Sequence, residues 1–261
     1  MTGYLLRCLR RVPLGLVVFA VALGVWEAWA RAEGSFLVPT ASAVAERARH
    51  VWSTPEFLAD VAASLKRLAA GYGIGAAFGV TVGVAMGSSR RVRQVLEPLV
   101  ELLRATPSIA IVPALIVILG FGDRMRIAVI AFGVVFPVLV NSMDGVRIIP
   151  IELRETASLL RVGRVERIVR VEIPAALPSI FAGLRVAISI GLVVVVISEF
   201  IGGGDGLGHY VLIERSKYDI PAMYAGILFL GLLGFVLNSV FLLVERRVLC
   251  WHYGTSGHGE H

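Results

Sequence analysis

Long apolar stretches recur along this chain and predict helices that cross a membrane. We predict six of them, near residues 12–30, 62–87, 95–120, 125–143, 177–200 and 222–244. Each is close to or above the roughly 20 residues that a helix needs to span the hydrocarbon core of a bilayer. The stretches are continuously apolar and lack the alternation of a membrane β-barrel strand. The pattern therefore predicts an all-α integral membrane protein.

Two of these segments carry further signals. The first follows Arg7, Arg10 and Arg11, as in a cleavable signal peptide, but it is long enough to span, and an even number of spans requires it. The third contains Pro107 and Pro113, which predict a kinked or split helix because an interior proline removes a backbone hydrogen bond. Between the first two spans, the stretch ASAVAERARHVW has the pattern of an amphipathic helix.

Lysine and arginine are distributed unequally between the two sides of the membrane. With the N-terminus in the cytoplasm, fourteen fall inside: Arg7, Arg10, Arg11, Arg90, Arg91, Arg93, Arg147, Arg154, Arg161, Arg164, Arg167, Arg170, Arg246 and Arg247. Seven fall outside: Arg31, Arg47, Arg49, Arg124, Arg126, Arg215 and Lys217. The positive-inside rule then places both termini in the cytoplasm. Residues 144–176 become the longest cytoplasmic loop.

Composition agrees with a membrane protein. Hydrophobic residues make up 57% of the 261 residues, above the roughly 45–50% of soluble domains. The net charge of +6 does not indicate nucleic acid, because aromatic residues do not interleave with the basic runs. Cys8 and Cys250 lie near the chain ends and are expected to be free thiols. The C-terminal histidines His252, His258 and His261 lack the spacing of a preformed metal site, so we expect no bound metal.

The second predicted span contains Gly71, Gly75, Gly79, Gly83 and Gly87. A spacing of four places these glycines along one face of a helix. In lipid, small residues let two helix backbones approach closely. The spacing predicts tight packing against another helix. A seam that slides, or that joins two copies, is the alternative interpretation.

Several ionisable residues fall within or beside the spans: Glu27, Lys66, Arg67, Glu97, Glu101, Arg104, Arg185 and Glu199. Charges at membrane depth usually face protein or water. Arg104 and Arg185, with Pro107 and Glu199, are our candidates for a translocation path that accepts an anion. Snorkelling to the interface or internal ion pairing is the alternative.

Residues 155–178, ETASLLRVGRVERIVRVEIPAALP, separate the fourth and fifth spans. From Leu153 to Val171 the pattern predicts one amphipathic helix with arginines on one side, which Pro174 and Pro178 then end. Three interpretations are open: docking to a partner protein, binding to anionic lipid headgroups, or a solvated loop. The chain has no GxxxxGK[ST], HExxH or GxSxG motif, so we expect no catalytic residue and no ATP site in it.

The same segment resembles the EAA loop of ABC-importer permeases, whose pattern is E-A-A-x₃-G-x₉-I-x-L-P. Glu155, Ala157 and Pro174 match the pattern, Thr156 replaces an alanine, and Val171 and Ile173 replace its Ile and Leu. The pattern's glycine falls on Arg161, with Gly163 two residues later. The stretches LEPLVELLRATPSIAIVPALIVILGFGD, FPVLVNSMDGV and SEFIGGGDGLGHYV are similar to the branch that imports nitrate, sulfonates, taurine and bicarbonate.

This resemblance implies a permease homodimer in a bacterial inner membrane, with two ATPase subunits and an extracytoplasmic solute-binding protein. ATP and magnesium would be used by the partner, with no cofactor bound by this chain. A coupling helix between the fourth and fifth spans would contact the ATPase through Glu155, Thr156, Ala157, Leu160, Arg161, Gly163 and Arg164. The expected organisation is an N-terminal span and extracytoplasmic segment (1–58), a permease core (59–245) with its coupling loop at 145–176, and a disordered cytoplasmic tail (246–261).

Two rival functions remain open on the sequence alone. A stand-alone secondary transporter would use membrane carboxylates such as Glu101 and Glu199 as proton sites, and such proteins often contain inverted repeats. No convincing internal repeat is present. An intramembrane enzyme would need a paired nucleophile and base or a metal cluster, and none stands out in the spans.

Overall fold

The computed structural model describes residues 14–250, and every regular element in that range is a helix. The start of the first predicted span, Cys8 and the tail from residue 251, with its three histidines, lie outside the described residues. The described chain forms two compact units. The first comprises residues 14–58 and 210–229, and the second residues 59–209 and 230–250. Residues 210–229 thus group with the N-terminal segment.

The first unit contains α2 (Leu14–Glu33), α3 (Ala41–Val51) and parts of three further helices. The amphipathic pattern of α3 buries Val44, Ala48 and Val51 on one face, and Thr40 caps its N-terminus by accepting a hydrogen bond from the Ala43 amide. Aromatic side chains pack beside this face, with Trp52, Phe57 and Phe229 meeting edge to face. Glu27 forms an ion pair of 2.7 Å with Arg31.

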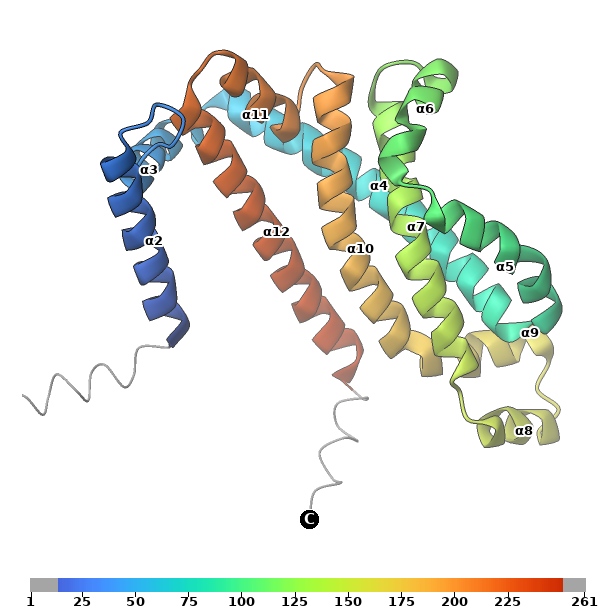
Figure 1. Cartoon of the computed structure of the whole chain (residues 1–261). Helices are drawn as coiled ribbons and strands as arrows, with labels where there is room; N and C mark the ends of the chain where they lie inside the picture. Colours follow the sequence, from blue (N-terminus) through green and yellow to red (C-terminus); the bar gives the residue numbers. More distant parts are fainter. Residues whose placement is uncertain (1–13, 251–261) are drawn as a thin grey trace, which may run out of the picture. The chain divides into compact units, whose positions relative to one another are not determined.

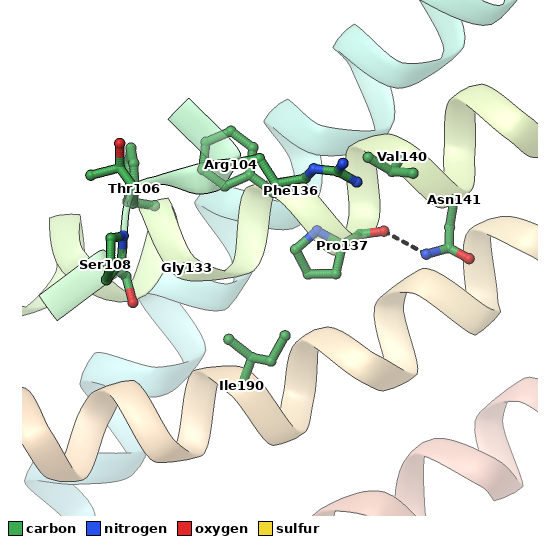
Figure 2. Close-up of a pocket in the computed structure, with 11 residues that line it drawn as sticks. Arg104, Thr106, Ser108, Gly133, Phe136, Pro137, Val140, Asn141 and Ile190 are labelled. Atoms are coloured by element: carbon green, nitrogen blue, oxygen red, sulfur yellow. Dashed lines mark hydrogen bonds between the residues drawn. The ribbon is translucent and has the colours of Figure 1, made fainter. Parts of the chain in front are cut away.

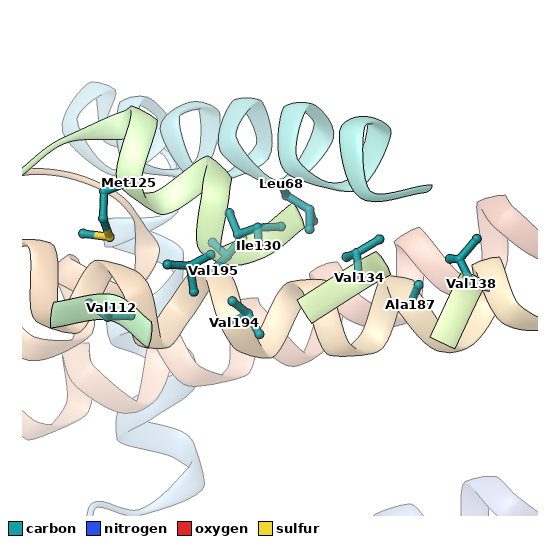
Figure 3. Close-up of a cluster of buried hydrophobic side chains, with 10 residues drawn as sticks. Leu68, Val112, Met125, Ile130, Val134, Val138, Ala187, Val194 and Val195 are labelled. Atoms are coloured by element: carbon teal, nitrogen blue, oxygen red, sulfur yellow. The ribbon is translucent and has the colours of Figure 1, made fainter. Parts of the chain in front are cut away.

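The second unit is built around three long helices, α4 (Pro55–Ser88), α7 (Asp123–Arg147) and α10 (Ile173–Gly202). Their facing sides, together with Val112, form a buried apolar cluster, shown in Figure 3. The residues of that cluster are Leu68, Val112, Met125, Val129, Ile130, Val134, Val138, Ala187, Val194 and Val195. Small residues also bring α10 close to α7, since a Cβ on Gly183 would meet the backbone of Pro137 at 2.9 Å.

The glycine stripe of α4 lies directly against α7. A Cβ added to Gly75 would come within 2.6 Å of the Ala131 carbonyl oxygen, and one added to Gly79 within 2.8 Å of the Val135 carbonyl oxygen. Gly71, Gly83 and Gly87 face Ile130, Ser142 and Val146 in the same way. Glycine is therefore required along this face, because any side chain would push the two backbones apart.

The third predicted span is broken. It consists of α5 (Arg90–Ala105), the 3₁₀ turn η1 (Ser108–Ile111) and α6 (Val112–Leu119), and the two halves meet at 90° (Figure 1). The break lies at Thr106 and Pro107, whereas Pro113 occupies the first turn of α6, where a missing N–H is tolerated. The chain then turns at Gly120 and Gly122, both with positive φ, and enters α7.

The single amphipathic helix predicted over Leu153–Val171 is wrong. Residues 148–172, which we call the basic segment, form α8 (Ile151–Leu159), a turn, the short α9 (Arg164–Arg167) and the π-helical turn η2 (Ile168–Glu172). α8 ends in a Schellman turn, because the Val162 amide donates to the Ala157 carbonyl and Arg161 has φ of 53°. Arg161 thus occupies the left-handed position that favours glycine.

The predicted break at the two prolines is also wrong. The helix runs on from η2 into α10, with Pro174 in the first turn of α10 and Pro178 inside it. A wider π turn next to a proline is one of the local adjustments that let membrane helices accommodate the missing N–H. The basic segment is therefore continuous with the following long helix.

Within residues 14–250, four helices are long and apolar enough to cross a membrane: Pro55–Ser88, Asp123–Arg147, Arg164–Gly202 and Ile220–Val248. The bent pair of α5 and α6 makes a fifth if it counts as one span. α2, which covers most of the first predicted span, is not among them. A short helix, α11 (Leu207–Ser216), precedes α12 (Ile220–Val248).

We predict that Gly75→Ala destabilises the fold by about 1–3 kcal/mol, because the new methyl group would overpack the contact with the α7 backbone. The matched control is Gly73→Ala on the same helix, where an added Cβ meets no atom within 4 Å. The control should be neutral or slightly stabilising, since alanine has the higher helix propensity. Thermal unfolding of the purified variants in detergent measures both effects. Equal stability of the two variants would contradict the proposed contact.

We predict that Arg161→Gly stabilises the protein by roughly 0.5–1 kcal/mol, because glycine adopts the left-handed conformation without the cost borne by an L side chain. Arg164→Gly removes the same side chain from a right-handed helical residue and should instead destabilise by about 1 kcal/mol. The same thermal unfolding assay compares the two. A shift of the same sign in both would show that charge rather than backbone conformation decides the outcome.

Candidate functional site

The basic segment exposes an unusual number of apolar side chains. Leu159 and Leu160, at the end of α8 and in its turn, are 83% and 73% exposed. Further exposed apolar residues of the segment are Ile148, Ile151, Leu153, Val165 and Val169. Together they form a mixed apolar and basic surface, which is typical of a site that contacts another molecule.

The predicted coupling residues lie at the tip of this segment. Glu155 and Thr156 are exposed on α8, whereas Ala157 is buried under it. Glu155 borders an open depression of about 420 Å³ together with Ile151, Arg154 and Leu159. Leu160 and Arg161 are exposed in the turn, and Gly163 and Arg164 begin α9. The seven residues thus cluster around one turn, with their polar groups outward.

A buried carboxylate, Glu172, anchors the basic segment and was missed in the sequence. It is 1% exposed and accepts a hydrogen bond of 2.5 Å from the Ser88 hydroxyl at the end of α4. The guanidinium groups of Arg167 and Arg154 approach it to 3.4 and 3.9 Å. Arg154 also donates to the Val146 carbonyl at the end of α7. The basic segment is therefore tied to both α4 and α7. In the sequence, the only signal for this anchor was the presence of an acidic residue within a run of arginines.

A cavity of about 430 Å³ lies where the broken span meets α7 and α10 (Figure 2). Its lining residues are Arg104, Thr106, Pro107, Ser108, Phe132, Gly133, Phe136, Pro137, Val140, Asn141 and Ile190. The break at Pro107 brings Thr106 and Ser108 into this wall, and Figure 2 shows the Asn141 amide donating to the Pro137 carbonyl. Arg104 is the only charged residue in the lining, and it pairs with Glu101 at 2.8 Å.

This cavity has the chemistry of a small-anion site. A half-exposed guanidinium provides charge, and Ser108 and Asn141 carry groups able to donate hydrogen bonds, whereas the Thr106 hydroxyl already donates to the Leu102 carbonyl. Gly133 keeps the space open, because a Cβ there would lie 3.2 Å from Val194 and 3.6 Å from Ser108. Arg104 and Pro107, two of the four predicted path residues, therefore line the same cavity.

The other two predicted path residues lie outside this cavity. Arg185 on α10 forms an ion pair with Glu245 on α12. Glu199 is fully buried and accepts hydrogen bonds from Ser64 at 2.7 Å, from Arg67 at 2.9 Å and from the Gly208 amide at 2.9 Å. Ion pairing, the alternative interpretation for such charges, describes both residues.

Glu199 belongs to a polar network that the sequence did not predict. Arg67 also binds Asp123 at 2.6 Å and Asp205 at 2.5 Å, and Arg126 binds Asp205 at 3.2 Å. Burial raises the pKa of Asp205, but the hydrogen bonds from Arg67 and Arg126 outweigh it and hold that pKa below its usual value. In the sequence, the glycine-rich stretch GGGDGLG was the available signal for this network. The positive φ of Gly206 lets the loop wrap around the Glu199 carboxylate.

Comparisons with known proteins agree on one family. The family model described as binding-protein-dependent transport system inner membrane component matches residues 75–249. The taurine transport system permease protein TauC of Escherichia coli (strain K12) is 29% identical over 93% of this chain and 91% of its own length. The nitrate import permease protein NrtB of Leptolyngbya laminosa is 27% identical over 92% of this chain and 88% of its own.

The fold has a counterpart among solved structures. The MetNI methionine ABC transporter, in inward facing conformations, matches with a TM-score of 0.63 over 71% of this chain and 93% of that chain. At 19% identity this likeness concerns the fold alone. The family match covers the glycine stripe from Gly75 onward, the broken span, the cavity and the basic segment. This chain therefore belongs to the binding-protein-dependent transport system inner membrane component family, and it is a membrane permease subunit of an ABC transporter rather than an enzyme.

Proposed function

We propose that this permease forms the translocation path of an ATP-driven importer for a small anionic solute of the nitrate, sulfonate or taurine kind. The family acts with ATPase subunits and solute-binding proteins in general. In our proposal the importer contains two copies of this chain, two ATPase subunits that use ATP and magnesium, and an extracytoplasmic binding protein that delivers the solute. The observation that carries the proposal is the exposed apolar surface of the basic segment.

The shape of the basic segment supports docking to an ATPase over binding to lipid. A helix that lies on headgroups is usually continuous, with one apolar face buried in the membrane. Here α8 is short, ends at the turn of Arg161, and leaves Leu159 and Leu160 exposed at its tip. A compact knob with an apolar tip suits a cleft on a protein surface. A solvated loop would not explain why the apolar side chains of Leu159 and Leu160 are exposed.

The anchoring of the segment supports a role in transmitting force. Glu172 joins Arg154 and Arg167 of the basic segment to Ser88, and η2 leads without a break into α10. A push on α8 therefore acts on α4, α7 and α10 together. We propose that Glu155, Thr156, Ala157, Leu160, Arg161, Gly163 and Arg164 form the contact that receives this push.

For the topology we propose six spans with both termini in the cytoplasm of a bacterial cell, which requires α2 to serve as the sixth span. The excess of arginine in residues 144–176 and at Arg246 and Arg247 supports this orientation. In that orientation the basic segment faces the cytoplasm, where the ATPase resides. The Glu199 network then lies toward the extracytoplasmic ends of α4, α7 and α10.

For the path itself we propose the cavity beside Pro107, with Arg104 as the group that favours anions. The pairing of Arg104 with Glu101 leaves the guanidinium half exposed and able to exchange its partner for a solute anion. The rival mechanism of a proton-driven transporter would use Glu199 as a proton site. Glu199 is fully buried and its carboxylate is bound by Ser64, Arg67 and the Gly208 amide, so it lacks the access to water that a proton site on a transport path requires.

We predict that Glu155→Lys lowers both uptake and recovery of the ATPase with the tagged permease by more than about tenfold, because a reversed charge in a docking surface disfavours the complex. The level of the permease in the membrane should not change. The matched control is Glu33→Lys, an exposed acid at the end of α2 far from the basic segment in sequence. Uptake by a permease recovered without any ATPase would contradict the proposed mechanism.

We predict that Arg104→Gln lowers the maximal uptake rate by roughly tenfold to a hundredfold, since a hydrogen bond to a charged group contributes about 1.5–3 kcal/mol. Arg104→Lys should keep part of the rate because it keeps the charge. Arg91→Gln, an exposed arginine of the same helix that does not line the cavity, is the control. Uptake is measured with radiolabelled taurine, nitrate and bicarbonate. Equal rates for Arg104→Gln and the control would exclude Arg104 from the path.

A further inference from the structure

A second hollow in the same unit is separate from the Arg104 cavity and is almost wholly apolar. It measures about 270 Å³ and is formed by α4, α10 and α12. Its lining residues are Leu65, Leu68, Ala69, Tyr72, Ile188, Leu237, Val240, Phe241 and Val244. Val240 and Val244 are about half exposed, so the groove opens along one side. All three helices are long and apolar enough to cross a membrane, so this groove lies at membrane depth.

Neither water nor a polar ligand would find hydrogen-bond partners in this groove. Its only hydrogen-bonding side chain is Tyr72, whose hydroxyl donates to the Leu184 carbonyl at 3.0 Å and is therefore occupied. A buried water needs two or more polar partners, and an apolar hollow supplies none. The occupant must therefore be a hydrocarbon.

The dimensions favour a single hydrocarbon chain over a helix. The stretch of α12 from Leu237 to Val244 is about 10 Å long at 1.5 Å per residue. An α-helix with side chains is about 10 Å or more across, so a piece of that length occupies roughly 800 Å³. The groove's volume of about 270 Å³ therefore admits side chains of a second helix but not the helix itself. An acyl chain is much narrower and can lie along the groove.

Basic side chains gather at one end of the groove. Arg185 lies one turn from Ile188 on α10, and its ion-pair partner Glu245 directly follows Val244 on α12. Arg246 and Arg247 come next and are exposed at the end of the apolar helix. The three arginines outnumber the single glutamate, so this end has a surplus of positive charge at the level of the lipid headgroups. An anionic headgroup complements it.

We propose that an anionic phospholipid binds here, with an acyl chain in the groove and its phosphate beside Arg185, Arg246 and Arg247. The lipid would fill the space that α10 and α12 leave over α4. Each exposed arginine near an anionic headgroup contributes about fivefold in affinity. The site is independent of the proposed transport path, because no residue lines both the groove and the Arg104 cavity.

The test is native mass spectrometry of the purified transporter, released from detergent after equilibration with a mixture of phosphatidylglycerol and phosphatidylethanolamine. Two variants address the two halves of the site. Ala69→Phe fills the groove from α4. The double variant Arg246→Gln, Arg247→Gln removes two positive side chains proposed to contact the lipid headgroup and leaves the buried core unchanged. The matched controls are Ala77→Phe, exposed on the same helix outside the groove, and the double variant Arg90→Gln, Arg91→Gln on α5.

We expect the wild-type protein to retain phosphatidylglycerol in preference to phosphatidylethanolamine. The arginine double variant should lose phosphatidylglycerol affinity by about tenfold to thirtyfold, Ala69→Phe should lose the bound lipid, and both controls should keep it. Retention of phosphatidylglycerol by both site variants would overturn the proposal. A change of oligomeric state in Ala69→Phe, with lipid binding unchanged in the arginine variant, would also overturn it and make the groove a contact between copies.

Discussion

The close approach of α4 to α7 is the contact on which the rest of the second unit depends. Glycines four residues apart remove every side chain from one face of α4, so the backbone of α7 fits directly against it. Helices in lipid gain little from burying apolar area against each other, and such close backbone contact is a main source of their association. The pair then presents Leu68, Val134 and Val138 as a surface on which α10 packs through Ala187, Val194 and Val195.

α10 is held at both ends by buried carboxylates. Glu172, just before its first residue, binds arginines of the basic segment, and Glu199, near its last turn, binds Arg67 of α4. Buried charges are costly unless they are paired and hydrogen-bonded, and both carboxylates meet that condition. Such anchors fix the helix ends while the middle remains apolar. In the proposed importer, movement of the basic segment would therefore reach the far end of the core through one continuous helix.

The two hollows of this unit differ in chemistry because a different structural feature creates each of them. The break at Pro107 turns the third span aside and leaves polar groups at Thr106, Ser108 and Asn141 facing a space beside Arg104. The apolar groove arises where α10 and α12 are joined by the Arg185 ion pair at one end but leave room over α4. One hollow therefore suits a solute anion, and the other suits a hydrocarbon chain.

The sequence by itself determined where most of the long apolar helices lie, that the second span needs a close neighbour, and that the third span is broken, because these follow from apolar length, glycine spacing and proline chemistry. The tertiary structure alone decided which groups meet. Arg67 binds partners 56, 132 and 138 residues away, and no local periodicity carries that information. The tertiary structure also decided where the basic segment divides and where its helix continues. The Schellman turn at Arg161 depends on the packing of Ala157, and the π turn before Pro174 depends on the packing of Glu172.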